Sequence, residues 1–213
     1  MYYISLSDYL KSKYNTKVYK LSLSSGCTCP NRDGSISYGG CIFCSEGGSG
    51  DFAASAILDL DEQISCAKRR VNAKISSKIP LQQRKYIAYF QSFTNTYGDE
   101  DYLKNLFKRV LDYPEIVGLS IGTRPDCLSD NMISYLDKLN RHKEVWVELG
   151  LQTIHEDTAN LINRGYKLQV FKEAYSRLTR VGIKVVVHVI LGLPGESEDD
   201  ILETIKYLSN LNF

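Results

Sequence analysis

The sequence has no long hydrophobic run and almost no net charge. None of its apolar segments approaches the roughly 20 residues that a helix needs to cross a bilayer, so we expect no membrane span. Lysine and arginine number 26 against 25 aspartate and glutamate residues, which leaves a net charge of +1. This balance excludes the strongly basic surface of a dedicated nucleic-acid-binding domain, although it is compatible with a small local basic patch.

The start, MYYISLSDYLKSKY, is polar and lacks the apolar stretch of a signal peptide, so we expect no secretory leader. Six cysteines in 213 residues are few for a disulfide scaffold, and a chain of this length can bury a core without crosslinks. We therefore expect a cytoplasmic protein whose reduced cysteines serve as metal ligands or in catalysis. For Cys66 and Cys127, which lie far from the other four, we expect burial as small hydrophobic side chains.

A glycine-rich loop, GCTCPNRDGSISYGGCIFC, contains the other four cysteines. Cys29, Cys41 and Cys44 form a C-x11-C-x2-C pattern, and Cys27 lies two positions upstream. Thiolates are the ligands that zinc, copper(I) and iron–sulfur clusters select. Three thiolates would leave one iron of a 4Fe–4S cluster open to another molecule, whereas all four could form a structural zinc site. The spacing alone leaves both alternatives open.

Five apolar segments rich in β-branched and aromatic residues are bounded by loop signals, as strands buried on both faces are. They are VYKLS (18–22), KYIAYFQ (85–91), IVGLSIG (116–122), VWVELGL (145–151) and KVVVHVIL (184–191). The segments between them have helical periodicity, with Ser129 predicted as an N-cap, Ser197 and Asp200 as a capping box, and Gly182 at a helix C-terminus. This alternation predicts βαβ units with a parallel sheet, and the loops after the strands should converge on one face.

Several motifs in register resemble the radical S-adenosylmethionine (SAM) superfamily. TCPNRDG…GGCIFC (28–44) is similar to its cluster loop, and SIGTRPD (120–126), ELGLQT (148–153), INRGY (162–166) and HVILGLPGE (188–196) continue the likeness. The branch resembled is uncharacterised and related to the Elongator catalytic subunit and to oxygen-independent coproporphyrinogen oxidase. The resemblance implies an α/β fold, a partial (β/α) barrel with five parallel strands, spanning residues 1–213 as one radical SAM core.

The resemblance also implies the chemistry. A 4Fe–4S cluster would be held by Cys29, Cys41 and Cys44, with Cys27 excluded, and SAM would chelate the fourth iron. Reductive cleavage of SAM would yield methionine and a 5′-deoxyadenosyl radical that abstracts hydrogen from an unknown substrate. The implied partners are SAM and a flavodoxin-like or ferredoxin-like one-electron reductant, and transfer RNA is a candidate substrate. The alternative is a zinc or iron–sulfur binding module without radical chemistry.

Further residues correspond to SAM-contacting positions of the family. They are Phe43, Ser92, Phe93, Thr94, Glu148, Gln152, Arg164, His188, Ile190 and Gly192. Ser92, Phe93 and Thr94 stand where relatives have a glycine-rich segment, so their backbone groups are the expected contacts. Gln152 and Arg164 match residues that hold the ribose and carboxylate, and an arginine fork suits a carboxylate. Ile190 and Gly192 match the segment beside the adenine.

Four of these residues have alternative structural interpretations. Phe43 could be a core anchor, Arg164 a solvated charge at a helix end, and His188 a hydrogen-bonded core residue. Glu148 lies on a strand predicted to be buried, where an unpaired charge is costly, so we expect it to be paired and to face the site. The family core continues beyond the fifth helix, so we expect the C-terminal part of the barrel to be missing from a chain that ends at Phe213.

Overall fold

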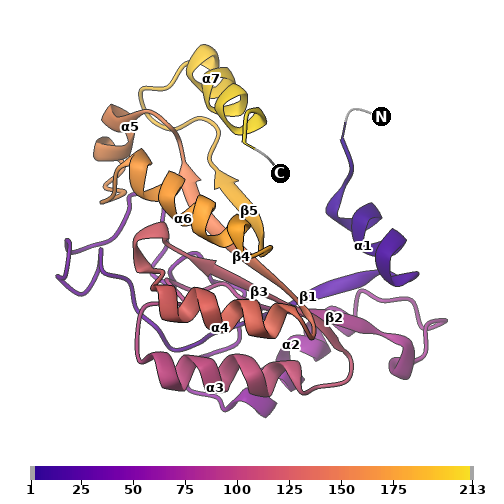
Figure 1. Ribbon diagram of the computed structural model, residues 1–213. Coiled ribbons are helices and arrows are strands. Elements are labelled where there is room, and N and C mark those ends of the chain that lie inside the picture. The colour runs from indigo at the N-terminus through magenta and orange to yellow at the C-terminus, as the bar shows by residue number, and fades with distance from the viewer. Residues whose placement is uncertain (1–2, 212–213) are drawn as a thin grey trace.

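The computed structural model of the protein describes residues 3–211. Within them, five strands form one parallel sheet in the order β1-β2-β3-β4-β5 (Figure 1). The strands are β1 (Val18–Leu23), β2 (Lys85–Phe90), β3 (Ile116–Thr123), β4 (Glu144–Gln152) and β5 (Lys184–Val189). The five predicted strands are thus confirmed, and the sheet is the open, partial barrel that the sequence predicts. The strands lie in the sheet in the same order as in the chain, so each strand pairs with the next one along the sequence.

Helices alternate with the strands, and most of them lie on one face of the sheet (Figure 1). They are α1 (Leu6–Tyr14), α2 (Leu60–Asn72), α3 (Glu100–Leu111), α4 (Asp130–Asn140), α5 (Glu156–Leu161), α6 (Leu168–Arg180) and α7 (Glu198–Ser209), with short 3-10 turns at Leu81–Gln83 and Pro125–Cys127. The predicted caps are confirmed, because Ser129 accepts from Met132 N at 2.9 Å and Ser197 with Asp200 forms a capping box. Gly182 follows α6 with φ 75°, a backbone conformation that suits glycine. No described helix is long and apolar enough to cross a membrane.

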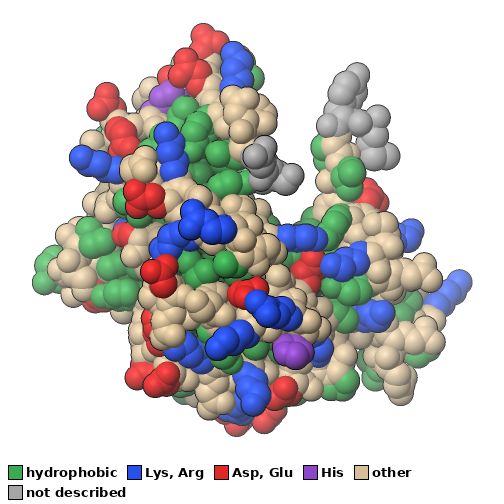
Figure 2. Space-filling view, in the orientation of Figure 1, with side chains coloured by type: hydrophobic (Ala, Val, Ile, Leu, Met, Phe, Trp, Pro, Cys, Tyr) green, Lys and Arg blue, Asp and Glu red, His purple; other side chains and the backbone are tan. Residues whose placement is uncertain are grey.

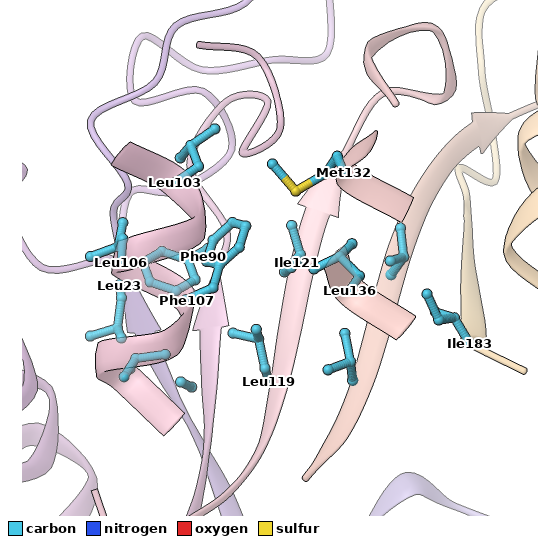
Figure 3. Close-up of a cluster of buried hydrophobic side chains, with 14 of the residues drawn as sticks. Leu23, Phe90, Leu103, Leu106, Phe107, Leu119, Ile121, Met132, Leu136 and Ile183 are labelled. Carbon is cyan, nitrogen blue, oxygen red and sulfur yellow. The ribbon is translucent and has the colours of Figure 1, made fainter. Parts of the chain in front are cut away.

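The main core lies between the sheet and helices α2, α3, α4 and α6 (Figure 3). Alternate residues of each strand point into it, as Leu119 and Ile121 of β3 do, and they meet the apolar faces of the helices. Phe90 of β2 and Phe107 of α3 lie with ring centroids 5.3 Å apart at its centre. Burial of this helix-covered face leaves the other set of alternating side chains on the opposite, concave face.

Helix α1 covers the lower part of that concave face, near the amino ends of the strands. Its Leu10 packs with Val18, Ile87 and Trp146 in a second, smaller apolar cluster. A hollow lined by apolar residues of α1, α6 and β5 lies beside it and is visible between α1 and α7 in Figure 2. The sequence did not predict α1, because its apolar residues are too few for a clear helical stripe.

Cys66 and Cys127 correct one expectation. Both are free and only partly buried, so the prediction that they are buried small side chains is wrong. Cys66 lies on α2, where its sulfur accepts from Arg69 Nη2 at 2.9 Å. Cys127 lies in the 3-10 turn after β3, beside the Asp126 carboxylate at 3.7 Å.

Candidate functional site

One cleft at the carboxyl ends of the strands collects most of the predicted site residues. Those lining it are Cys29, Cys41, Phe43, Cys44, Phe93, Thr94, Glu148, Gln152, Arg164 and His188. They come from the loops after β1 and β2, from β4 and its following loop, and from β5. Loops after parallel strands share one edge of the sheet, and that topology brings together residues more than 150 positions apart.

The cysteine loop is held in shape by its own backbone. Cys29 O accepts from Arg32 N at 2.8 Å, and Cys44 N donates to Cys41 O at 3.0 Å. The Arg32 guanidinium donates to Cys44 O at 3.2 Å and to Ser45 O at 2.5 Å. Gly40 has φ 82°, and a Cβ there would lie 2.8 Å from the Arg32 side chain. A glycine is therefore required where the loop folds over Arg32.

The three predicted ligands differ from Cys27 in their surroundings. Cys29, Cys41 and Cys44 all line the cleft as free thiols, whereas Cys27 is outside its lining. Burial raises the pKa of Cys41, and this is partly offset by a hydrogen bond from Asn31 and by the charge of Arg124. Burial likewise raises the pKa of Cys27. Here the partial offset comes from hydrogen bonds with Ser25 and Tyr97, not from a cation. Positive charge beside the cleft favours the thiolate form that metal ligation needs.

The donor set fits an iron–sulfur cluster in its chemistry. Three free thiols share one cleft, and thiolates are the usual ligands of such clusters. Among the described residues, no three His, Cys, Asp or Glu side chains are placed to hold a single metal ion. In a cluster, each thiolate binds its own iron, so its ligands surround the cluster without meeting at one ion.

Glu148 is the centre of a hydrogen-bonded network on the concave face. Lys20 and Ser120 both donate to Glu148 Oε1, and His188 Nε2 lies 2.8 Å from Oε2. Tyr89 also bonds this carboxylate, and the Lys20 ammonium lies 4.1 Å from the Tyr89 ring centroid. Each of the five strands thus contributes one side chain to the network. The expectation that Glu148 is paired and faces the site agrees with this arrangement.

The electrostatics of Glu148 follow from these partners. Burial by itself would raise the pKa of its carboxyl, but the hydrogen bond with His188 and the charge of Lys20 outweigh burial and lower the pKa to about 2. The Glu148 side chain is only 2% exposed, while that of His188 is 46% exposed. His188 is therefore a partly exposed residue that lines the cleft, and its interpretation as a core histidine does not fit the structure.

We expect Glu148→Gln to lower the free energy of unfolding at pH 7 by about 3 kcal/mol, because lowering the pKa of this buried carboxyl from 4.5 to about 2 corresponds to about that much stabilisation of the native state. The native carboxyl has a pKa below its ordinary value of 4.5, so its stabilising effect is complete above that pH and is lost as pH falls toward 2. Urea unfolding should therefore show a smaller difference between wild type and variant at pH 3 than at pH 7. As a control, Asp137→Asn at the exposed pair with Arg141 should change stability by less than about 1 kcal/mol. Equal differences at the two pH values would contradict the ion-pair argument.

Arg164 is held mainly by backbone carbonyls. Its Nη1 donates to Leu151 O at 2.9 Å and to Thr153 O at 2.7 Å, and its Nε donates to Tyr166 O at 3.0 Å. The side chain is 1% exposed, so the alternative of a solvated helix-end charge does not fit the structure. Among the described residues, Nη2 makes no hydrogen bond and lies 3.6 Å from the Glu156 carboxylate. This buried nitrogen, on a residue that lines the cleft, can donate to an anionic oxygen of a bound molecule.

Gln152 and Phe93 line the cleft with unusual backbone conformations. Gln152 has φ 63° and Phe93 has φ 60°, in the left-handed region that residues with side chains rarely adopt. Gln152 Oε1 accepts from the Tyr166 hydroxyl at 3.1 Å. No hydrogen bond from its amide nitrogen to a described residue is found. Strained backbone of this kind is frequent at binding sites, where the surrounding fold maintains it.

Three predicted SAM contacts lie outside the cleft lining: Ser92, Ile190 and Gly192. Ser92 is buried and packs against Gly50, where an added Cβ would collide with the Ser92 Oγ. Ile190 N donates to Gln152 O at 3.1 Å, and its side chain lines a small separate cavity. Gly192 is exposed, with φ 79° and no atom within 4 Å of where a Cβ would stand. Backbone contacts by these residues remain predictions.

The structure adds cleft residues that sequence reasoning missed, among them Arg124 and Tyr166. Arg124 forms a double hydrogen bond with Asp126, at 2.9 and 2.7 Å, and donates to Arg164 O at 2.8 Å. The guanidinium carbons of Arg124 and Arg164 each lie 4.8 Å from the Tyr166 ring centroid. Both missed residues stand inside quoted motifs, TRPD and INRGY, so their position directly after β3 and α5 was an available signal.

Comparison with known proteins identifies a family. A model described as the radical SAM superfamily matches residues 26–208. The uncharacterised protein YtqA of Bacillus subtilis is 45% identical over 210 residues, which cover 99% of this chain and 63% of that protein. Protein YhcC of Escherichia coli is 37% identical over 198 residues, covering 92% of this chain and 61% of its own length. The chain thus spans about three fifths of the length of these curated relatives.

Two solved structures share the fold. One is the archaeal Elp3 of Methanocaldococcus infernus with an N-terminal deletion, with a TM-score of 0.60 and 20% identity, covering 89% of this chain and 41% of that one. The other is coproporphyrinogen III oxidase (HemN) of Escherichia coli, described as a radical SAM enzyme, with a TM-score of 0.57 and 15% identity. That alignment covers 98% of this chain and 46% of HemN. At these identities the likeness supports the partial barrel fold.

Proposed function

The chain belongs to the radical SAM superfamily, and from this premise we propose that it is a radical SAM enzyme that binds a 4Fe–4S cluster and SAM in the cleft. Cys29, Cys41 and Cys44 would hold the cluster. When bound, the cluster and SAM supply an electron and a 5′-deoxyadenosyl radical, which abstracts hydrogen from a substrate. The observation that carries the proposal is one cleft lined by these three free thiols and by Arg164, whose buried Nη2 has no hydrogen-bond partner among the described residues.

The protein's own residues would bind and orient SAM. Arg164 Nη2 would donate to the SAM carboxylate, and the amide of Gln152 would hold the ribose. Arg164 is preorganised for this role, because three carbonyls already fix its guanidinium. A donor that is fixed before binding loses little conformational entropy when its ligand arrives.

The remaining cleft residues would shape and shield the site. Phe43 and Phe93 give it two aromatic surfaces, and burial of the reacting groups protects a radical from water. Thr94 lies at the same edge, with its backbone nitrogen donating to Thr28 O at 3.3 Å. Glu148, already bonded by four neighbours, would support Lys20 and His188, which are more exposed and available to a substrate or to SAM.

The decisive test is anaerobic reconstitution of the chain with iron and sulfide, followed by dithionite reduction with SAM. Chromatography should show 5′-deoxyadenosine and methionine formed in equal amounts. A protein that instead carries stoichiometric zinc without iron would support the alternative of a metal-binding module. Cluster binding without SAM cleavage would support an iron–sulfur module of the same kind.

The substrate and the electron donor are a separate question. A flavodoxin-like or ferredoxin-like protein as reductant and transfer RNA as substrate stay predictions, as does a cytoplasmic location. The same holds for the domain boundary, with residues 1–213 forming the radical SAM core. Because the chain spans about three fifths of its relatives, these questions are best tested with a full-length relative such as YtqA alongside.

A further inference from the structure

Asn31 connects a predicted cluster ligand to the turn that carries Arg164. Its side chain is completely buried, and its Nδ2 lies 3.4 Å from Cys41 Sγ. The same nitrogen donates to Asn163 O at 2.6 Å and to Arg164 O at 3.2 Å. The two amide protons of Asn31 thus face the Cys41 thiol of the same loop and two backbone carbonyls of a distant turn, those of Asn163 and Arg164.

Asn163 supports the same loop from the other side without touching a thiol. Its Nδ2 donates to Gly40 O at 2.9 Å and to Ser37 Oγ at 3.0 Å. A backbone bond from Ile42 N to Ile162 O, at 3.2 Å, completes the attachment. The turn at residues 162–164 is therefore fastened to the cysteine loop by two side-chain amides, of which one reaches a ligand sulfur.

We propose that Asn31 is a positioning residue that holds the Cys41 sulfur by an N–H···S hydrogen bond and thereby tunes the reduction potential and the retention of the bound cluster. This rests on the proposed function, since it presupposes that Cys41 is a cluster ligand. Hydrogen bonds to ligand sulfurs favour the more negative, reduced cluster and so raise its reduction potential. Partners that orient ligands typically contribute about 10-fold to 100-fold to metal affinity.

The two asparagines form a matched pair for the test. Asn31→Ala removes the sulfur contact together with support of the loop. Asn163→Gly removes loop support alone, and glycine accepts the φ of 54° that Asn163 adopts. Asn31→Asp keeps the shape of the side chain but replaces the N–H donor by an acceptor.

The experiment uses the whole reconstituted chain and measures iron per chain, the rate of iron loss to a chelator, and the midpoint potential by EPR-monitored titration. For Asn31→Ala and Asn31→Asp we expect a more negative midpoint potential and iron loss about 10-fold faster or more. For Asn163→Gly we expect faster iron loss at the wild-type potential. Thermal unfolding of the apo-proteins shows whether each variant is folded.

The outcomes separate this inference from the proposed function. A wild-type chain that binds no cluster would overturn the proposed function itself. A wild-type chain that binds the cluster, with the same potential in the Asn31 variants, would overturn only the role of Asn31. The folded Asn31 variants could also fail to load iron. In that case, normal iron loading by Asn163→Gly supports the proposal. Equal failure of Asn163→Gly would show that Asn31 only supports the loop, and this would overturn the proposal.

Discussion

Replacing Cys29, Cys41 or Cys44 by alanine is expected to abolish the brown colour of the anaerobically reconstituted protein and to reduce bound iron from about four per chain to nearly none. Each thiolate would bind a different iron, so the loss of any one leaves an exposed cluster corner that hydrolyses readily. Chemical analysis of iron and sulfide measures the effect directly, as does the absorbance of the cluster's charge-transfer bands in the visible range.

Cys27→Ala is the matched control for this series. Cys27 is two residues from Cys29 but does not line the cleft, and its thiol lies near Gly98. We expect the variant to keep its full complement of iron. Loss of the cluster in Cys27→Ala, with retention in one of the other three variants, would show that the ligand assignment is wrong.

Gln152→Ala and Arg164→Ala are expected to weaken SAM binding to the reconstituted protein, each by about 1–3 kcal/mol for a lost buried polar contact. The two variants should differ in a second respect. Arg164→Ala also removes a donor from three backbone carbonyls, of which Leu151 O keeps its bond from Thr153 N, so it should destabilise the apo-protein. Among the described residues, the Gln152 side chain has one hydrogen-bond contact, with Tyr166. Isothermal calorimetry for SAM and urea unfolding for stability separate the two effects.

Gln152→Asn serves as the control for backbone strain, because asparagine tolerates the left-handed conformation that Gln152 adopts at φ 63°. It should unfold like wild type and still bind SAM less tightly, since its amide is one methylene shorter. Unchanged SAM affinity in Gln152→Ala and in Arg164→Ala would mean that these residues do not contact SAM.

Local patterns determined the architecture of this protein. The apolar segments at 116–122 and 145–151 are strands because they are continuous and β-branched, and helix ends such as Ser129 are set by hydrogen bonds within four residues. Parallel pairing then places every strand's carboxyl end at one edge, so the sequence already predicted that the cysteine loop and Gln152 would meet. Short-range chemistry and a single topological rule were sufficient for this part.

The prediction that Cys29, Cys41 and Cys44 are cluster ligands rests on the motif, whereas the surroundings of these cysteines depend on tertiary contacts. No pattern along the chain indicates that Asn31 reaches the carbonyls of Asn163 and Arg164, 132 and 133 positions away. The partners of Glu148 come from four other strands, and only the curvature and register of the sheet bring Lys20, Ser120 and His188 to one carboxylate.

Arg164 shows the division most clearly. Its presence in INRGY predicted a ligand-binding guanidinium, but three of its donor contacts go to the backbone. Within the described part of the chain, only Nη2 is left without a hydrogen bond. Ile190 and Gly192 also lie outside the cleft lining, and the Ile190 side chain lines a separate small cavity. The sequence by itself determined which strands form and at which edge the polar loops gather, because those depend on neighbouring residues and on parallel pairing. Which atoms remain free to bind was decided by the tertiary structure, because hydrogen-bond satisfaction depends on groups that are distant along the chain.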